Sequence, residues 1–141
     1  MKKLFLSLVA LTIATMSYAQ SNLVATLTHG DELIMFYGAY TLRDAHNAAE
    51  NGDIINLSSG TFQAVDITKA LTIRGAGADG DNITYIVNGF SINIPTDITK
   101  RLSFEGVRLS NTTTVKGTLT NPTFLKTIID KISISYLFRV S

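Results

Sequence analysis

Carboxylate and amide side chains gather in the glycine-rich stretch RGAGADGDN, at Asp79, Asp81 and Asn82. Oxygen ligands of this kind suit calcium, which takes six or more of them. The same residue types also build solvated turns that hold no ligand. The sequence therefore offers these three residues as a candidate calcium site, with an ordinary turn as the alternative.

The same stretch has the spacing GxGxxG, at Gly75, Gly77 and Gly80. In dinucleotide-binding proteins such a loop leads from a strand into a helix whose N-terminus holds the pyrophosphate. Here the loop is followed by DNITYIV, which is β-branched and strand-like. This context argues against nucleotide binding and for a loop between strands, so calcium is the one cofactor we consider.

A repeated phrase carries the other charged candidates. DITKALTIRG begins at Asp66, and DITKRLSFEG begins 31 positions later, at Asp97. If the two copies stack in register, Arg74 faces Glu105, which is a favourable cross-strand pair. The same register sets the two aspartates side by side, and likewise the two lysines. That arrangement is unfavourable unless each aspartate reaches the lysine of the other copy.

Adjacent carboxylates at Asp66 and Asp97 could serve acid and base catalysis or hold a metal. The neighbouring lysines favour simple neutralisation instead. Arginines in such a row could also bind a sugar acid. We assign no catalytic residue and interpret the row as a structural surface charge ladder formed by Asp66, Lys69, Arg74, Asp97, Lys100 and Glu105. The two histidines, His29 and His46, lack metal-ligand spacing, and we expect both to be exposed.

Short strands must position these residues. After Gly52 the chain consists of short runs rich in Ile, Val, Thr and Phe, separated by Gly, Asn, Asp, Ser and Pro. In both copies apolar and polar residues alternate, which gives each strand one apolar face. Similar strands near Ile55 and Phe124 extend the series to four rungs at uneven offsets. Asn88 and Gly89 form the only obvious hairpin signal. The pattern predicts an all-β fold, a parallel β-helix of about four coils.

The region before the coils has a different character. TLRDAHNAAENG places Thr41 ahead of an apolar face at helical spacing, with Asp44 three positions on, as in a capping box. We predict a helix over residues 41–50 that covers the N-terminal end of the coils. The stretch before it, Leu23 to Tyr40, has a mixed pattern in which LIMFYGAY, residues 33–40, could form a strand interrupted by Gly38. The predicted organisation is a cap region at 20–52 and coils at 53–141.

The first 19 residues have the pattern of a secretory signal peptide, with two lysines, a short apolar run and small residues before Gln20. The apolar run is shorter than the roughly 20 residues that cross a membrane. We therefore expect an exported protein, in the periplasm, at the cell surface or outside the cell, with no membrane span.

The composition limits the classes of binding partner and of covalent link that we expect. The whole chain has 12 basic and 11 acidic residues, and two of the lysines belong to the signal segment, so no basic surface is expected to attract nucleic acid. The absence of cysteine excludes disulfides and thiolate metal sites. Packing alone must hold the fold.

The passage from Thr41 to Gly77 resembles the entry segment of right-handed parallel β-helix proteins of the pectin-lyase-like superfamily. The shared features are a short helix with paired alanines, a GlyAsp pair at 52–53, an apolar strand, the turn GlyThrPhe at 60–62, and a lysine-containing strand closed by Gly75. The downstream stretch is similar to exported β-helix proteins of Bacteroidetes with no assigned activity.

The resemblance implies a fold rather than an activity. Lyases and hydrolases of that superfamily act on polysaccharides in a groove along the stacked coils, but their aspartate and histidine signatures are absent from this sequence. We predict a noncatalytic module with a structural or glycan-contacting role. The alternative is a member or fragment of a carbohydrate-active enzyme, a polysaccharide lyase or glycoside hydrolase. The apolar end ISISYLFRVS leaves open both a truncated chain and end-to-end self-association through unpaired strand edges.

Overall fold

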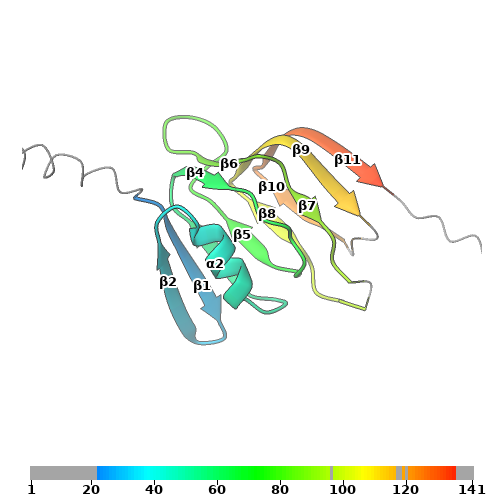
Figure 1. The fold of residues 1–141 in the computed structure, drawn as a ribbon, viewed down its shortest axis with the longest axis horizontal. Helices are drawn as coiled ribbons and strands as arrows, with labels where there is room; N and C mark the ends of the chain where they lie inside the picture. Colours follow the sequence, from blue (N-terminus) through cyan, green and yellow to red (C-terminus); the bar gives the residue numbers. More distant parts are fainter. Residues whose placement is uncertain (1–21, 96, 117–118, 120, 136–141) are drawn as a thin grey trace, which may run out of the picture.

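The computed structural model describes residues 22–95, 97–116, 119 and 121–135. Here the predicted fold is confirmed: the chain forms a mostly β structure, a β-solenoid of about 4 turns, with one short helix near the N-terminus (Figure 1). Within this part of the chain, no helix is both long enough and apolar enough to cross a membrane. The predicted signal peptide at 1–19 and the end of the predicted coils at 136–141 lie outside the described residues.

Each coil contributes one strand to the first sheet and one to the second, except that coil 2 contributes two short strands, β6 and β7, to the second sheet. In chain order the strands are β3 (Ile54–Leu57) and β4 (Gly60–Gln63) in coil 1; β5 (Thr72–Arg74), β6 (Thr84–Val87) and β7 (Ser91–Ile92) in coil 2; β8 (Ser103–Glu105) and β9 (Arg108–Lys116) in coil 3; β10 (Thr123–Leu125) and β11 (Ile128–Ser135) in coil 4. Successive coils pair in parallel, as β3, β5, β8 and β10 in the first sheet and as β4, β6, β9 and β11 in the second.

Inward-facing apolar residues line up from coil to coil in columns that make the core. One column is Ile55, Ile73, Phe104 and Phe124; a second is Phe62, Ile86, Leu109 and Ile129; a third is Ile67, Ile92 and Val115. The rings of Phe104 and Phe124 stack with their centroids 5.7 Å apart. No coil can bury its inner face alone, so this stacking is what stabilises the fold.

The second half of the repeated phrase pairs as predicted. Strands β5 and β8 lie side by side in the expected register, so that Ile73 is next to Phe104 and Arg74 next to Glu105. Both Ile73 and Phe104 are fully buried. The alternation of apolar and polar residues was therefore a reliable guide to which side chains face the core.

The first half of the phrase does not pair with its copy. Ile67 forms a parallel bridge with Ile92, and its N–H donates to the carbonyl of Ser91. The segment from Ile92 to β8 is longer than the segment from Ile67 to β5, and Asp97 lies in the extra length. The prediction that Asp66 lies beside Asp97 is therefore wrong.

A β-hairpin precedes the coils. Strands β1 (Val24–His29) and β2 (Glu32–Tyr37) are antiparallel and are joined by Gly30 and Asp31, with Gly30 at φ 57°. Glycine at the first position of a two-residue turn permits this left-handed backbone. Because β1 also pairs antiparallel with β3, the hairpin extends the first sheet to the order β10-β8-β5-β3-β1-β2. The strand predicted within residues 33–40 is present as β2, but it ends before Gly38 and does not continue beyond it.

Asn88 and Gly89, the sequence's hairpin signal, form a corner of coil 2 instead. Both have positive φ, at 75° and 71°, and they connect β6 to β7. These two strands pair with β9 and not with each other. A coil corner uses the same left-handed backbone as a hairpin turn, which explains why the dipeptide indicated a hairpin.

The helix α2 (Thr41–Ala48) is two residues shorter than predicted and has no capping box. Tyr40 precedes its first turn without a side-chain capping bond, and the buried Thr41 hydroxyl has no partner among the described residues. Leu42 and Ala45 are buried where the helix packs on β1, β3 and β4 (Figure 1). The spacing of apolar residues thus predicted the helix correctly, whereas the predicted capping box at its N-terminus is not formed.

Lys69 fastens this helix to the coils. Its ammonium donates to the carbonyls of His46, Asn47 and Ala49 at 2.7, 3.0 and 2.6 Å. The last carbonyls of a helix lack partners within the helix and carry its negative dipole end, so a cation is favoured there. The first DITK lysine is therefore a helix cap rather than a rung of a charge ladder.

We expect Lys69→Met to lower the free energy of unfolding by about 1–3 kcal/mol, because charge-assisted hydrogen bonds to the helix carbonyls are lost. Lys100→Met is the matched control, since it removes the exposed lysine of the second DITK copy. Urea denaturation followed by circular dichroism measures both. Equal losses for the two variants would contradict the capping role.

Candidate functional site

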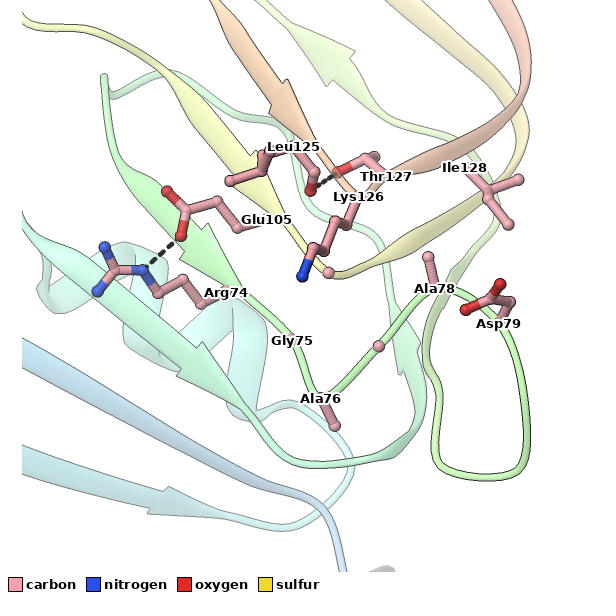
Figure 2. A pocket seen from close by; sticks show the side chains of 12 residues that line it. Arg74, Gly75, Ala76, Ala78, Asp79, Glu105, Leu125, Lys126, Thr127 and Ile128 are labelled. Atoms are coloured by element: carbon pink, nitrogen blue, oxygen red, sulfur yellow. Dashed lines mark hydrogen bonds and ion pairs between the residues drawn. The ribbon is translucent and has the colours of Figure 1, made fainter.

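An open groove of about 690 Å³ crosses coils 2, 3 and 4 on one side of the solenoid. It lies where each coil turns from the first sheet to the second, and its lining comes from residues 74–79, 105–106 and 125–128 (Figure 2). Stacked turns of a solenoid therefore build the groove, and a ligand in it would meet three coils.

The turns stack closely because their backbones touch. The N–H of Gly75 donates to the carbonyl of Glu105 at 2.8 Å, and the N–H of Gly106 donates to that of Leu125 at 3.0 Å. A Cβ at Gly75 would lie 2.6 Å from the carbonyl oxygen of Gly106 and 2.6 Å from Cβ of Thr84. Gly75 is therefore required by close approach of the coils.

Thr84, which blocks that Cβ position, is itself fixed by hydrogen bonds. Its hydroxyl is fully buried, accepts the N–H of Ala76 at 2.8 Å and donates to the carbonyl of Ser58 at 2.9 Å. These bonds join coils 1 and 2 at the floor of the turn. The backbone beside Gly75 consequently has little freedom to move away from an added methyl group.

The groove carries charges of both signs. Nε of Arg74 lies 2.7 Å from Oε2 of Glu105, and the hydroxyl of Ser103 donates to Oε1 of Glu105 at 3.3 Å. Lys126 and Asp79 also line the groove, and Lys126 extends across it from the turn of coil 4 (Figure 2). Among the described residues no carboxylate pairs with the Lys126 ammonium.

Lys126 has an unusual backbone, with φ at 47°. It occupies the turn position that Gly106 holds in coil 3, at φ 61°. Left-handed geometry costs a side-chain-bearing residue roughly 1–2 kcal/mol. The turn is held by Thr127, whose hydroxyl donates to the carbonyls of Phe104 and Leu125, each at 3.0 Å. Lys126 was not among the site residues predicted from sequence, although extending the repeat to FLKTI would have aligned it with Gly106.

The structure places the three calcium candidates on one surface loop. Asp79, Asp81 and Asn82 are exposed on the loop after β5, and of the three only Asp79 lines the groove. In the described part of the chain, no three His, Asp or Glu side chains come close enough together to hold a metal. Calcium bound here would need backbone and solvent oxygens in addition.

The glycine-rich stretch with the GxGxxG spacing forms a loop between two strands, as the sequence indicated. Gly75 and Gly77 leave β5, the loop turns at Gly80 with φ 82°, and the chain enters β6. A strand therefore follows where a dinucleotide site needs a helix N-terminus.

The predicted charge ladder is only partly assembled. Arg74 and Glu105 form an ion pair, as their register requires. Asp66 and Asp97 are separated by the unequal return segments, and Lys69 is bound to helix α2. Lys100 is exposed and lies beside Gly52. Of the six predicted ladder residues, Arg74 and Glu105 are therefore the pair that the structure brings together, because strand pairing between the two copies begins at Thr72, the seventh residue of the phrase.

The histidines occupy different environments. His29 is exposed, as predicted, and its Nδ1 lies 2.9 and 3.0 Å from the two carboxylate oxygens of Asp53. Asp53 is buried and also accepts the N–H of Glu50 at 2.7 Å. The hydrogen bond to Asp53, and next its charge, raise the pKa of His29. This pair joins the hairpin to the first coil.

His46 is buried, so its predicted exposure is wrong. Its Nε2 accepts the N–H of Thr68 at 3.3 Å, which ties helix α2 to coil 1. Burial, and next the charge of Lys69, lower the pKa of His46. The helical spacing of the apolar residues did not reveal this polar contact, since it depends on where coil 1 returns.

Searches against models of known families, curated proteins and solved structures find no match. Fold and groove define the chain as a β-solenoid with a charged groove over its stacked turns.

We expect Gly75→Ala to destabilise the fold by about 1–3 kcal/mol, because the added methyl group meets backbone and a buried threonine. Gly77→Ala is the matched control, since its Cβ would come no closer than 3.2 Å to another residue. Thermal and urea unfolding of both variants measure the difference. A Gly77→Ala loss as large as that of Gly75→Ala would contradict the close stacking of coils 2 and 3.

We expect Asp53→Asn to lower the pKa of His29 toward its ordinary value of 6.5, because the charge and the ion-pair hydrogen bond are lost. Glu32→Gln, which removes the smallest contribution, should lower it much less. NMR titration of the imidazole protons measures both shifts.

The raised pKa of His29 determines how its contribution to stability changes with pH. Its stabilising contribution is complete below the pKa of the unfolded state and is lost as pH rises through the higher pKa of the folded state. An unchanged His29 titration in Asp53→Asn would show that the pair does not form in solution.

Proposed function

We propose that this chain is an exported, noncatalytic β-solenoid module that contacts acidic polysaccharide through the groove over coils 2 to 4. The observation that carries the proposal is the groove itself, lined by turns from three coils and bearing Arg74 and Lys126. An extended polymer suits a surface that repeats along one axis. The export signal in the sequence and the resemblance to the pectin-lyase-like superfamily support the same kind of ligand.

The charges favour a carboxylate ligand. Nε of Arg74 is engaged by Glu105, which leaves the outer guanidinium donors for other acceptors. Lys126 adds a second cation with no carboxylate partner in the described residues. Both side chains are solvent-accessible, so a uronate carboxylate could replace water there at modest desolvation cost.

A polysaccharide lyase or hydrolase is the second candidate, because two carboxylates, Asp79 and Glu105, line the same groove as Lys126. Both carboxylate oxygens of Glu105 already have partners, Oε2 in the ion pair with Arg74 and Oε1 in the hydrogen bond from Ser103, so neither is free to take a proton from a substrate. Asp79 is exposed on a loop, and its carboxylate has no ion-pair partner in the described part of the chain. We therefore favour binding over catalysis.

We expect the protein to bind oligogalacturonate and not a neutral oligosaccharide of the same length, with affinity that falls as salt rises. Lys126→Gln should weaken binding roughly tenfold, equivalent to about 1.4 kcal/mol. Lys116→Gln, at an exposed lysine outside the groove, is the matched control. Isothermal titration calorimetry measures all three proteins.

Two outcomes would contradict the proposal. Equal weakening by Lys126→Gln and Lys116→Gln would place the contact outside the groove. Release of unsaturated uronates or new reducing ends during the titration, with calcium supplied, would instead establish the enzyme.

A further inference from the structure

The two edges of the six-stranded sheet have the same strand direction. In the described part of the chain, β2 forms one edge and β10 the other. Strand β1 runs antiparallel to both β2 and β3, so β2 runs parallel to β3 and to every later strand of that sheet. The hairpin thus presents an edge of the same direction as another coil would.

Both edges also expose apolar side chains. On β2, Leu33, Met35 and Tyr37 are 63%, 50% and 69% exposed, and on β10, Leu125 is 53% exposed. Edge strands of soluble proteins usually carry charges or proline that prevent pairing with another chain. Residues 33–37 of β2 carry neither. This surface has the character of an interface.

One column of core residues runs through the whole first sheet and so shows which residues of the two edge strands would face each other. Ile34 pairs with Leu27, which stands in the column of Ile55 and Phe104 that ends at Phe124. If β10 of one copy continues this column into β2 of the next, Phe124 meets Ile34 on the inner side. Leu125 then meets Met35 on the outer side, and each covers the other's exposed surface.

Charge supports the same arrangement. The hairpin tip carries Asp31 and Glu32, at the end of the sheet where its coil strands begin. At that corner coil 3 carries the exposed cation Arg101, whose guanidinium lies 3.5 Å from the hydroxyl of Thr123 at the start of β10. A second copy stacked on coil 4 brings its acidic tip toward this basic corner, which favours head-to-tail contact.

We propose that copies of this chain associate head to tail, with β10 of one copy pairing in parallel with β2 of the next. The first sheet then continues from molecule to molecule. Such a heterologous contact does not close on itself, so it produces short filaments rather than a symmetric dimer. A row of modules would also repeat the groove at regular intervals, but the contact does not depend on the groove's ligand.

The absence of cysteine allows a direct test. Met35→Cys and Leu125→Cys are mixed in equal amounts under mild oxidation. Parallel strands lie about 4.8 Å apart, which is within the Cα separation that a disulfide spans. We expect a disulfide between positions 35 and 125, at least tenfold faster than a control mixture of Asn47→Cys with Leu125→Cys, because Asn47 is exposed on helix α2 and is not part of the edge strand.

The proposal would be overturned if a disulfide between two Leu125→Cys chains formed faster than the mixed disulfide. That result would indicate contact between two coil-4 ends. Mixed pairs forming no faster than the control would also overturn it.

Sedimentation of the cysteine-free protein gives an independent readout. We expect its average mass to rise with concentration, and Met35→Lys to weaken association at least tenfold while Asn47→Lys does not. Circular dichroism verifies that the variants are folded. A parent protein that stays monomeric throughout would overturn the proposal.

Discussion

The stacking of inward-facing apolar columns is the constraint on which the rest of this structure depends. Ile73 and Phe104 are fully buried only because coils 2 and 3 lie in register. A single coil has too little inner surface to order itself, and the chain has no disulfide to hold it. The N-terminal end must therefore be covered, and the hairpin with helix α2 does this. Lys69 and His46 attach that cover to coil 1 by hydrogen bonds rather than by apolar packing alone.

The same constraint shapes the groove. Coils that stack this closely leave no room for a side chain at Gly75, so the turn there is bare backbone. Beside this turn, Arg74 and Glu105 form an ion pair across adjacent coils. Coil 4 replaces the corresponding glycine with Lys126, which places a cation over the groove at the cost of a left-handed backbone. Close packing of the turns and an accessible charged surface thus arise from the same geometry.

The sequence predicted the features that depend on the alternation of apolar and polar residues. It did not predict those that depend on the lengths of the segments between strands. Apolar and polar residues alternate through β5 and β8, and both their register and their buried faces were predicted correctly. The position of Asp97 depended on the length of a return segment, which no periodicity encodes. The hairpin was missed because its only strong signal is Gly30 at the first turn position. Among site residues, the Arg74 and Glu105 pair was expected, whereas the roles of Lys126 and Lys69 depend on contacts that only the folded chain makes.

The coils stack with a change of register within the repeated phrase: Ile67 pairs with Ile92, 25 residues later, whereas Ile73 pairs with Phe104, 31 residues later. Interstrand nuclear Overhauser effects between backbone protons report this directly. The structure predicts contacts between Ile67 and Ile92 and between Ile73 and Phe104. Contacts between Ile67 and Ile98 would show instead that the whole phrase stacks on its copy, and would contradict the account of the core, the helix cap and the groove.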